Sequence, residues 1–255
     1  MSSHPLYLNQ IGNATVDLDA ANRITVAIPG KSMRTIPLHL VSRIVCRLQN
    51  SIGSRLLVEC MKQGIPVSFV DKNGSPTGWC LGVRRIENTV GQLMRHALDD
   101  PSFMTLYLSW LASQHQSISS QVMLECGLVR KSAHLPSIRA TLCNAHKEKH
   151  QAPAGRHLNS LSNVAIQELA AVLSKEIGDP SLLAWTMPGY NLINDLGQIL
   201  KWHSHNDVHH CTALPMMSDL NLWATKLYEQ KSSLWQLRIS HLKWSFEQFL
   251  RQHWL

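Results

Sequence analysis

The sequence predicts an α+β protein, with a β-sandwich-like domain over residues 1–86 followed by an α-helical domain over residues 87–255. Before about residue 85, short apolar segments alternate with turn residues, which is typical of strands. After it, apolar residues recur at helical spacing in longer segments. The chain has 255 residues, of which 44% are hydrophobic and 16% charged, and this composition excludes general disorder.

The N-terminal part contains apolar runs of strand length. Turn signals such as Gly12-Asn13 and Pro29-Gly30 separate them. Residues 54–63 differ, because their apolar side chains share one helical face and Gly64 follows as a stop signal. We therefore expect a helix over residues 54–63 and strands over residues 6–8, 15–18, 24–28, 35–38, 41–46 and 65–70.

The C-terminal part has the pattern of a helical domain. Residues 152–156 read as a linker within it. In the last segment, Trp235 and Phe246 belong to an apolar stripe that we expect in the core, although such a stripe with cations nearby can also stack on nucleotides or bind a partner. The expected helices cover residues 89–98, 103–114, 118–129, 163–177, 191–203, 215–230 and 234–254.

Several classes of protein are disfavoured by the composition. No apolar run approaches the ~18 residues of a membrane span, so we expect no membrane association. The first ten residues lack the charged and apolar regions of a secretion signal. Six scattered cysteines without a CxxC pair suit reduced thiols, so we expect a cytoplasmic protein.

The formal net charge is +7, and most of the positive excess lies in residues 1–98. Arg84, Arg85 and Arg95 lie close together in the sequence, at the change from strands to helices. They predict a face that contacts DNA phosphates. The alternative is an ordinary solvated surface on a basic protein.

Glu168 is the most informative residue of the helical part. Its helical neighbours three and four positions away are Val164, Ala165, Ala171 and Val172, all of them apolar. A carboxylate on such a face needs a cation, a hydrogen bond or a metal as partner. The alternative is a boundary residue that reaches water.

Asp219 repeats this arrangement, although an Asp near a helix N-terminus is also favoured by the helix dipole. Between Glu168 and Asp219, residues 201–211 contain four histidines. Carboxylates and neutral imidazoles together bind Mn²⁺ or Zn²⁺, and carboxylates with water bind Mg²⁺. Alternatively, residues 201–211 form an exposed polar loop, or residues 203–211 hold a structural zinc ion with Cys211.

The N-terminal half resembles a known family. The stretches Asn22–Val26, Ile36–Val45 and Gly64–Gly74 follow one another as in the CRISPR adaptation integrases, and Gln92–Asp99 resembles the start of that family's helical domain. The resemblance covers roughly residues 6–100. It implies a β-sandwich domain followed by an α-helical catalytic domain.

The resemblance also implies a site of Glu, His and a second acid. Ile166–Ala171 looks like the family's stretch around its Glu, which falls on Glu168. Met216–Asp219 looks like the family's Asp-Leu-Met-Glu tetrad, so the final acid is Asp219, and the His fourteen positions earlier is His205. The other candidates for the histidine are His209 and His210.

The function that this implies is a metal-dependent DNA endonuclease and integrase of CRISPR adaptation. It would insert spacer DNA into the repeat array by attack of a 3′-hydroxyl on a phosphodiester, with Mg²⁺ or Mn²⁺ held by Glu168, His205 and Asp219. The implied partners are double-stranded DNA, a second copy of the chain and the small second adaptation protein. The alternative is a catalytically degenerate relative that serves as a dimeric DNA- or partner-binding scaffold, which the imperfect tetrad favours.

Overall fold

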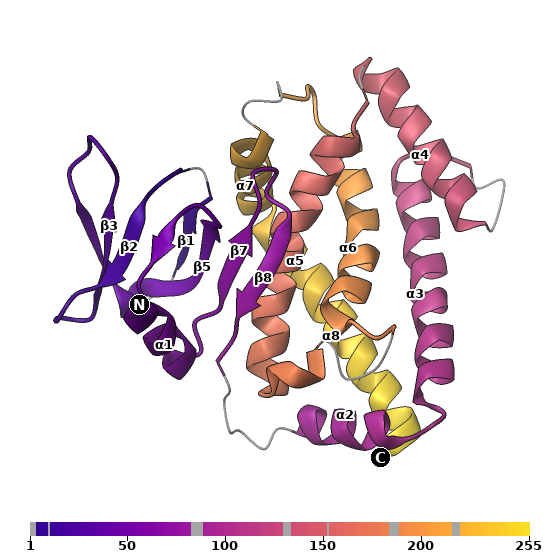
Figure 1. Ribbon diagram of the computed structural model, residues 1–255. Helices are drawn as coiled ribbons and strands as arrows, with labels where there is room; N and C mark the ends of the chain where they lie inside the picture. The colour runs from indigo at the N-terminus through magenta and orange to yellow at the C-terminus, as the bar shows by residue number, and fades with distance from the viewer. Residues whose placement is uncertain are drawn as a thin grey trace. The chain divides into compact units, whose positions relative to one another are not determined.

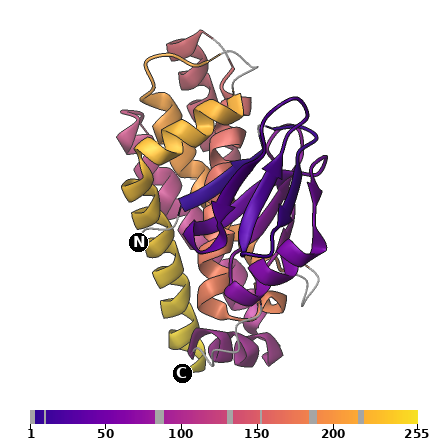
Figure 2. The ribbon, with the colours of Figure 1, turned by 90° about the vertical axis from the view of Figure 1, so that its left-hand side faces the viewer.

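The computed structural model describes residues 4–9, 11–82, 89–129, 134–151, 153–183, 189–215 and 220–255. Contacts divide the chain into two compact units. The first comprises Met1–Asn88 with Ala170–Pro180, and the second comprises Thr89–Leu169 with Ser181–Leu255. All described strands lie in the first unit, and the chain continues as helices, which confirms the predicted fold class (Figures 1 and 2). The predicted boundary at residues 86 and 87 falls outside the described residues.

Eight strands form two four-stranded sheets in the first unit. In one sheet the strand order is β1-β5-β7-β8, and in the other it is β4-β3-β2-β6. The strands are β1 (His4–Leu8), β2 (Thr15–Leu18), β3 (Arg23–Ala27), β4 (Arg34–Pro37), β5 (Val41–Arg47), β6 (Ser51–Ile52), β7 (Val67–Val70) and β8 (Pro76–Cys80).

Both sheets are mixed. β5 pairs in parallel with β1 and with β7, whereas β8 is antiparallel to β7. In the second sheet, β3 is antiparallel to β2 and β4, and the short β6 is parallel to β2. The alternation of buried and exposed residues along β2 is that of a sheet with one covered face.

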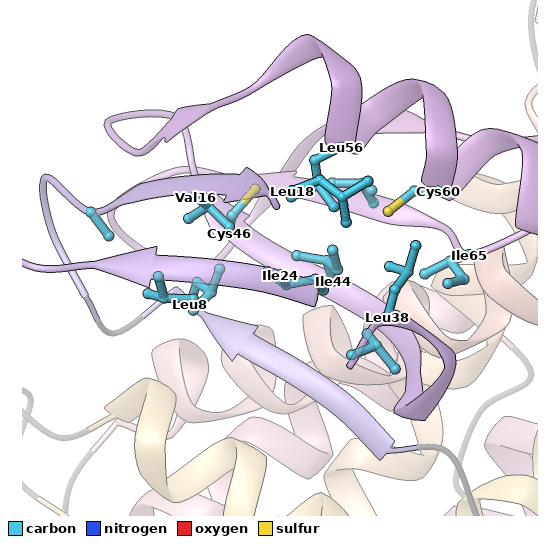
Figure 3. Close-up of a cluster of buried hydrophobic side chains, with 14 residues drawn as sticks. Leu8, Val16, Leu18, Ile24, Leu38, Ile44, Cys46, Leu56, Cys60 and Ile65 are labelled. Atoms are coloured by element: carbon cyan, nitrogen blue, oxygen red, sulfur yellow. The ribbon is translucent and has the colours of Figure 1, made fainter. Parts of the chain in front are cut away.

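The core of the first unit takes side chains from both sheets and from the helix α1 (Ser54–Gln63) (Figure 3). α1 ends at Gly64, which has a φ of 66° and so adopts the left-handed conformation that favours glycine. Its bounds are those that the sequence predicts. The core includes Leu8, Val16, Leu18, Ile24, Leu38, Ile44, Cys46, Leu56, Cys60 and Ile65.

After the strands the described chain is helical, with a short 3₁₀ helix at Pro180–Leu183; another, Leu38–Leu40, lies between β4 and β5. α3 packs against α4 and α6, α4 also packs against α6, and α8 contacts α2, α6 and α7. Trp235 and Phe246 of α8 are buried, as predicted. The helices are α2 (Thr89–Asp99), α3 (Phe103–Glu125), α4 (Leu135–His150), α5 (Gly155–Ile177), α6 (Leu192–His209), α7 (Leu220–Gln230) and α8 (Ser232–Trp254).

Three expectations for this part were wrong, and so was one of the alternatives. Residues 103–125 form one helix rather than two, because neither Gly nor Pro interrupts them. α4 was not predicted, and the predicted linker at residues 152–156 already contains the start of α5. The histidine-rich stretch is the second half of α6 up to His209, and not an exposed loop.

No helix in the described ranges is long and apolar enough to cross a membrane.

Candidate functional site

The candidate site is built on α6, which carries the histidine-rich stretch. Its N-terminus is capped by Asn191, whose side chain accepts a hydrogen bond from the Asn194 backbone N–H at 3.0 Å. Because of helical spacing, the polar side chains in the second half of α6 lie against different neighbouring helices. His205 meets α4, whereas His203 lies against Trp235 of α8, with ring centroids 6.5 Å apart.

His205 is buried, with 2% of its surface exposed. Its Nδ1 lies 3.0 Å from Nε2 of His146 on α4, and the two rings stack with centroids 5.2 Å apart. Burial and the neighbouring His146 lower the pKa of His205 to about 3, and burial lowers that of His146 to about 4. Both rings are therefore neutral near pH 7, and one N–H is donated between them.

Two further histidines extend this cluster along α4 and α6. The ring of His209 lies 5.6 Å from that of His146, and Nε2 of His150 lies 3.1 Å from the Val208 carbonyl oxygen. His209 is thus beside His205 in space. The other candidate, His210, is exposed and directs Nε2 toward the Glu125 carbonyl oxygen at 3.2 Å.

Glu168 lies on α5, a helix that packs closely on α6. A Cβ added to Gly197 of α6 would meet the Ile166 side chain at 2.7 Å, so the two helices touch at Ile166, which is two residues before Glu168 and points to a different side of α5. Glu168 is half-buried. Of its predicted apolar neighbours, Val164 and Ala165 are buried, so at least this part of the expected face is covered.

The remaining predicted site residues divide into two groups. Asp219, Arg84 and Arg85 lie outside the described residues. Arg95 lies on α2 and is exposed, as a DNA contact requires. The structure therefore brings His205 together with His146, and the combination of Glu168, His205 and Asp219 stays a prediction.

The described residues do not complete a metal site. Among them, no group of three or more His, Cys, Asp or Glu side chains is arranged to hold a metal ion. Residues 203–211 all lie within the described ranges, so the zinc alternative finds no ligand set there; Cys211 instead donates from Sγ to the Asp207 carbonyl oxygen at 3.4 Å. The proposed Mg²⁺ or Mn²⁺ site thus depends on Asp219.

Asp207 is a charged centre that the sequence reading missed. Its side chain is 1% exposed and accepts hydrogen bonds from Lys231 and Arg238, each at 2.7 Å. Arg238 also lies over the Trp235 ring, 4.8 Å from its centroid. The sequence offers little signal for this centre, because Lys231 and Arg238 are 24 and 31 positions from Asp207.

Asp195, in the first turn of α6, is a half-buried carboxylate that was not among the predicted site residues. It accepts a hydrogen bond from the Tyr107 hydroxyl at 2.9 Å, and burial raises its pKa.

Comparison with known families gives one match. The family described as "CRISPR associated protein Cas1" matches residues 13–162, more than half of the chain. A search of curated proteins finds no match.

Solved structures share the fold over nearly the whole chain. A CAS1 protein from Thermotoga maritima has a TM-score of 0.72 at 15% sequence identity, with 98% of this chain and 97% of that chain covered. A TtCas1–DNA complex has a TM-score of 0.59 at 13% identity, covering 95% and 91%. A Cas6-RT-Cas1–Cas2 complex has a TM-score of 0.58 at 11% identity, covering 99% of this chain and 35% of that chain.

Proposed function

Because the chain belongs to the CRISPR associated protein Cas1 family, we propose that it acts in CRISPR adaptation by joining spacer DNA to the repeat array. The family match is the observation that carries this proposal. In the joining step, the 3′-oxygen of the incoming strand forms a bond to phosphorus, and the target strand's P–O3′ bond breaks. A proton from the attacking hydroxyl is lost to solvent, and the leaving 3′-oxygen gains one, so the number of phosphodiester bonds is unchanged.

The proposed site consists of Glu168, His205 and Asp219, with Mg²⁺ or Mn²⁺ as the cofactor. The family-like stretch around Glu168 and the spacing of fourteen residues between His205 and Asp219 support this assignment. A neutral histidine is the form that ligates metals, and burial keeps His205 neutral by lowering its pKa to about 3. Bound metal would supply charge stabilisation at phosphorus.

The proposed partners are double-stranded DNA, a second copy of the chain and Cas2, the small second adaptation protein. One similar structure is a Cas1–DNA complex and another contains Cas2, which supports the first and the last of these. We propose the first unit as the dimerisation surface and Arg84, Arg85 and Arg95 as phosphate contacts. We propose a cytoplasmic location, which the six free cysteines support.

The test is a joining assay with a short duplex and a supercoiled target. Joining is expected with Mg²⁺ or Mn²⁺ and is expected to stop when a chelator removes the metal. Glu168→Ala and His205→Ala should lower the joining rate by at least ~100-fold, since each removes a proposed ligand. Glu176→Ala, a carboxylate further along the same helix, is the matched control. Undiminished joining by Glu168→Ala would contradict the site.

A second candidate function is a DNA-binding scaffold without catalysis. It is favoured by the imperfect tetrad Met216–Asp219, in which Met216 stands where the family has its first acid. It predicts duplex binding with a steep salt dependence and no joining with any divalent metal. The same assay separates the two candidates, because measured strand joining by the wild-type protein excludes the scaffold.

A further inference from the structure

The second unit contains a cavity of about 560 Å³ between the end of α6, one face of α7 and the residue before α8. The wall on α7 is formed by residues 222, 223, 226, 227 and 230, which lie together because they follow one another at helical spacing. The rest of the described lining comes from the last turn of α6, from residues 211–213 and from Lys231. The volume is that of a small-molecule site.

The wall on α7 has an apolar part. Leu222, Trp223 and Leu227 line the cavity, and Leu222 is 38% exposed. The half-buried Trp223 also packs edge-to-face with His157, with ring centroids 5.3 Å apart, which holds the indole in place. A bare inorganic ion would leave most of this volume and these side chains without contacts. The occupant that fits therefore has an organic body.

The described residues at the cavity carry an excess of positive charge. The carboxylate of Asp207 is 1% exposed and accepts hydrogen bonds from Lys231 and Arg238, so two cations already share one carboxylate. Lys226 of α7 adds an exposed cation to the lining and has no acidic partner among the described residues. Three cations against one carboxylate leave a net charge of +2, which an anion would balance.

Both lysines have donors left for such an anion. An ammonium group has three N–H donors, and Lys231 gives one of them to Asp207 while its side chain stays 31% exposed. Lys226 is exposed on a flexible four-carbon stem, so its ammonium group can move to a ligand in the cavity that its side chain lines.

The helix ends beside the cavity also permit an anion. α8 begins at Ser232, directly after Lys231, so the positive end of its dipole lies there. α6 ends at the cavity with its negative end, but the carbonyl oxygens of its last turn have donors of their own. The Val208 carbonyl oxygen accepts from Nε2 of His150 at 3.1 Å.

We propose that this cavity binds a nucleotide by its terminal phosphate, with Lys226 and Lys231 on the phosphate oxygens and the sugar and base against Trp223. A terminal phosphate carries a charge of about −1.5 to −2 near pH 7, which matches the net charge at the cavity better than the single charge of an internal phosphodiester. Two sources present this group: a free nucleotide, or the 5′-phosphorylated end of a DNA strand. The second source rests on the proposed function, because it needs DNA on the protein.

The experiment titrates the full chain in two arms. In the first, calorimetry compares a nucleoside 5′-monophosphate with the same nucleoside and with inorganic phosphate. In the second, fluorescence anisotropy compares a 5′-phosphorylated duplex with the same duplex bearing 5′-hydroxyls.

The variants separate charge from space. Lys226→Ala removes a phosphate donor, Lys226→Arg keeps the charge, and Ala213→Trp fills the cavity from an exposed position of its lining. Lys147→Ala, at an exposed position of α4 outside the described lining, is the matched control. Lys231 is left intact because its replacement would break the ion pair with Asp207. An unchanged melting temperature shows that a variant is folded.

We expect the nucleotide to bind more tightly than inorganic phosphate and the nucleoside. Lys226→Ala should weaken it about ten-fold, the loss expected for one charge-assisted hydrogen bond, and Ala213→Trp should abolish it. Lys226→Arg and Lys147→Ala should bind it like the wild type. Tighter binding of the 5′-phosphorylated duplex, lost in Lys226→Ala, would identify the strand end as a source.

Two results would overturn the proposal. One is no effect of the phosphate in either arm. The other is a phosphate effect that Lys226→Ala and Ala213→Trp both leave unchanged, since it would place the phosphate elsewhere. Failure to bind either duplex would instead count against the proposed function, and the nucleotide arm would still decide the cavity.

Discussion

His146 and His205 stack across α4 and α6, with an interplanar angle of 18° and a ring-nitrogen distance of 3.0 Å. This pair joins residues 59 positions apart in the sequence. It fixes the orientation of the histidine that we propose for the catalytic site. It also makes the stability of the helical unit depend on pH.

Stability should fall as the pH drops from 7 to 5. The pKa values of His146 and His205 are lowered to about 4 and about 3 in the folded protein, against 6.5 for an unperturbed histidine. Below 6.5 the unfolded chain therefore binds more protons, and the free energy of unfolding declines. The loss by pH 5 is on the order of 2 kcal/mol per histidine.

Urea unfolding at the two pH values measures this loss. His205→Leu should reduce the difference between pH 7 and pH 5, because it removes one of the titrating groups. His253→Gln, at an exposed position of α8, is the control and should leave the difference unchanged. An unaltered pH dependence in His205→Leu would contradict the assignment.

Asp207→Ala should destabilise the protein strongly. It leaves Arg238, whose side chain is 8% exposed, without its partner, together with the half-buried Lys231. Breaking a buried ion pair typically costs about 3–5 kcal/mol of unfolding free energy. Glu247→Ala breaks the more exposed pair with Arg251 on α8 and should cost no more than about 1 kcal/mol. Similar midpoints for the two variants in urea would show that Asp207 is not a structural centre.

Gly197→Ala should destabilise the contact of α5 with α6. Inside a helix, alanine is normally favoured over glycine by about 1 kcal/mol. Here the added Cβ would lie 2.7 Å from Cγ1 of Ile166, and overpacking of this kind costs about 1–3 kcal/mol. The net effect is expected to be a loss of about 1 kcal/mol.

Gly155→Ala provides the comparison for this substitution. A Cβ at Gly155, the first residue of α5, would meet nothing within 4 Å. We expect this variant to be neutral or slightly more stable than the wild type in thermal unfolding. A stabilising effect of Gly197→Ala would show that Ile166 moves aside freely.

The three candidate arginines predict the salt dependence of DNA binding. If Arg84, Arg85 and Arg95 each contact a phosphate, replacing each by Ala should reduce the slope of log affinity against log salt by roughly 0.9. Titrations of a duplex at several salt concentrations measure the slope. Lys62→Ala, at an exposed position of α1, should leave it unchanged. A triple variant with the wild-type slope would place the phosphate contacts elsewhere.

The first unit follows closely from the sequence because its signals are local. In α1, an apolar face and a following glycine set both ends. The strand β8 was missed because Pro76, Gly78 and Thr77 resemble turn residues, and only pairing with β7 makes them a strand.

The helical unit was less predictable because its buried faces contain polar residues. In α4 the buried stripe is Ile138, Leu142 and His146, spaced at four residues, but a histidine does not count as apolar in a pattern. The burial of His205 is explained by a partner on another helix, which a single sequence does not reveal. Glu168 could be proposed from the sequence because its neighbours Val164 and Ala165 are apolar, a signal within one helix, and its role stays a prediction.

The first unit is built from two separate parts of the chain, since Ala170–Pro180 belongs to it together with Met1–Asn88. During synthesis, the intervening 81 residues must therefore be translated before all residues of the first unit are present. Contacts between segments so distant in sequence form late, because closing a long loop costs entropy. A fragment that ends near residue 88 would therefore lack one part of the first unit, the last part of α5.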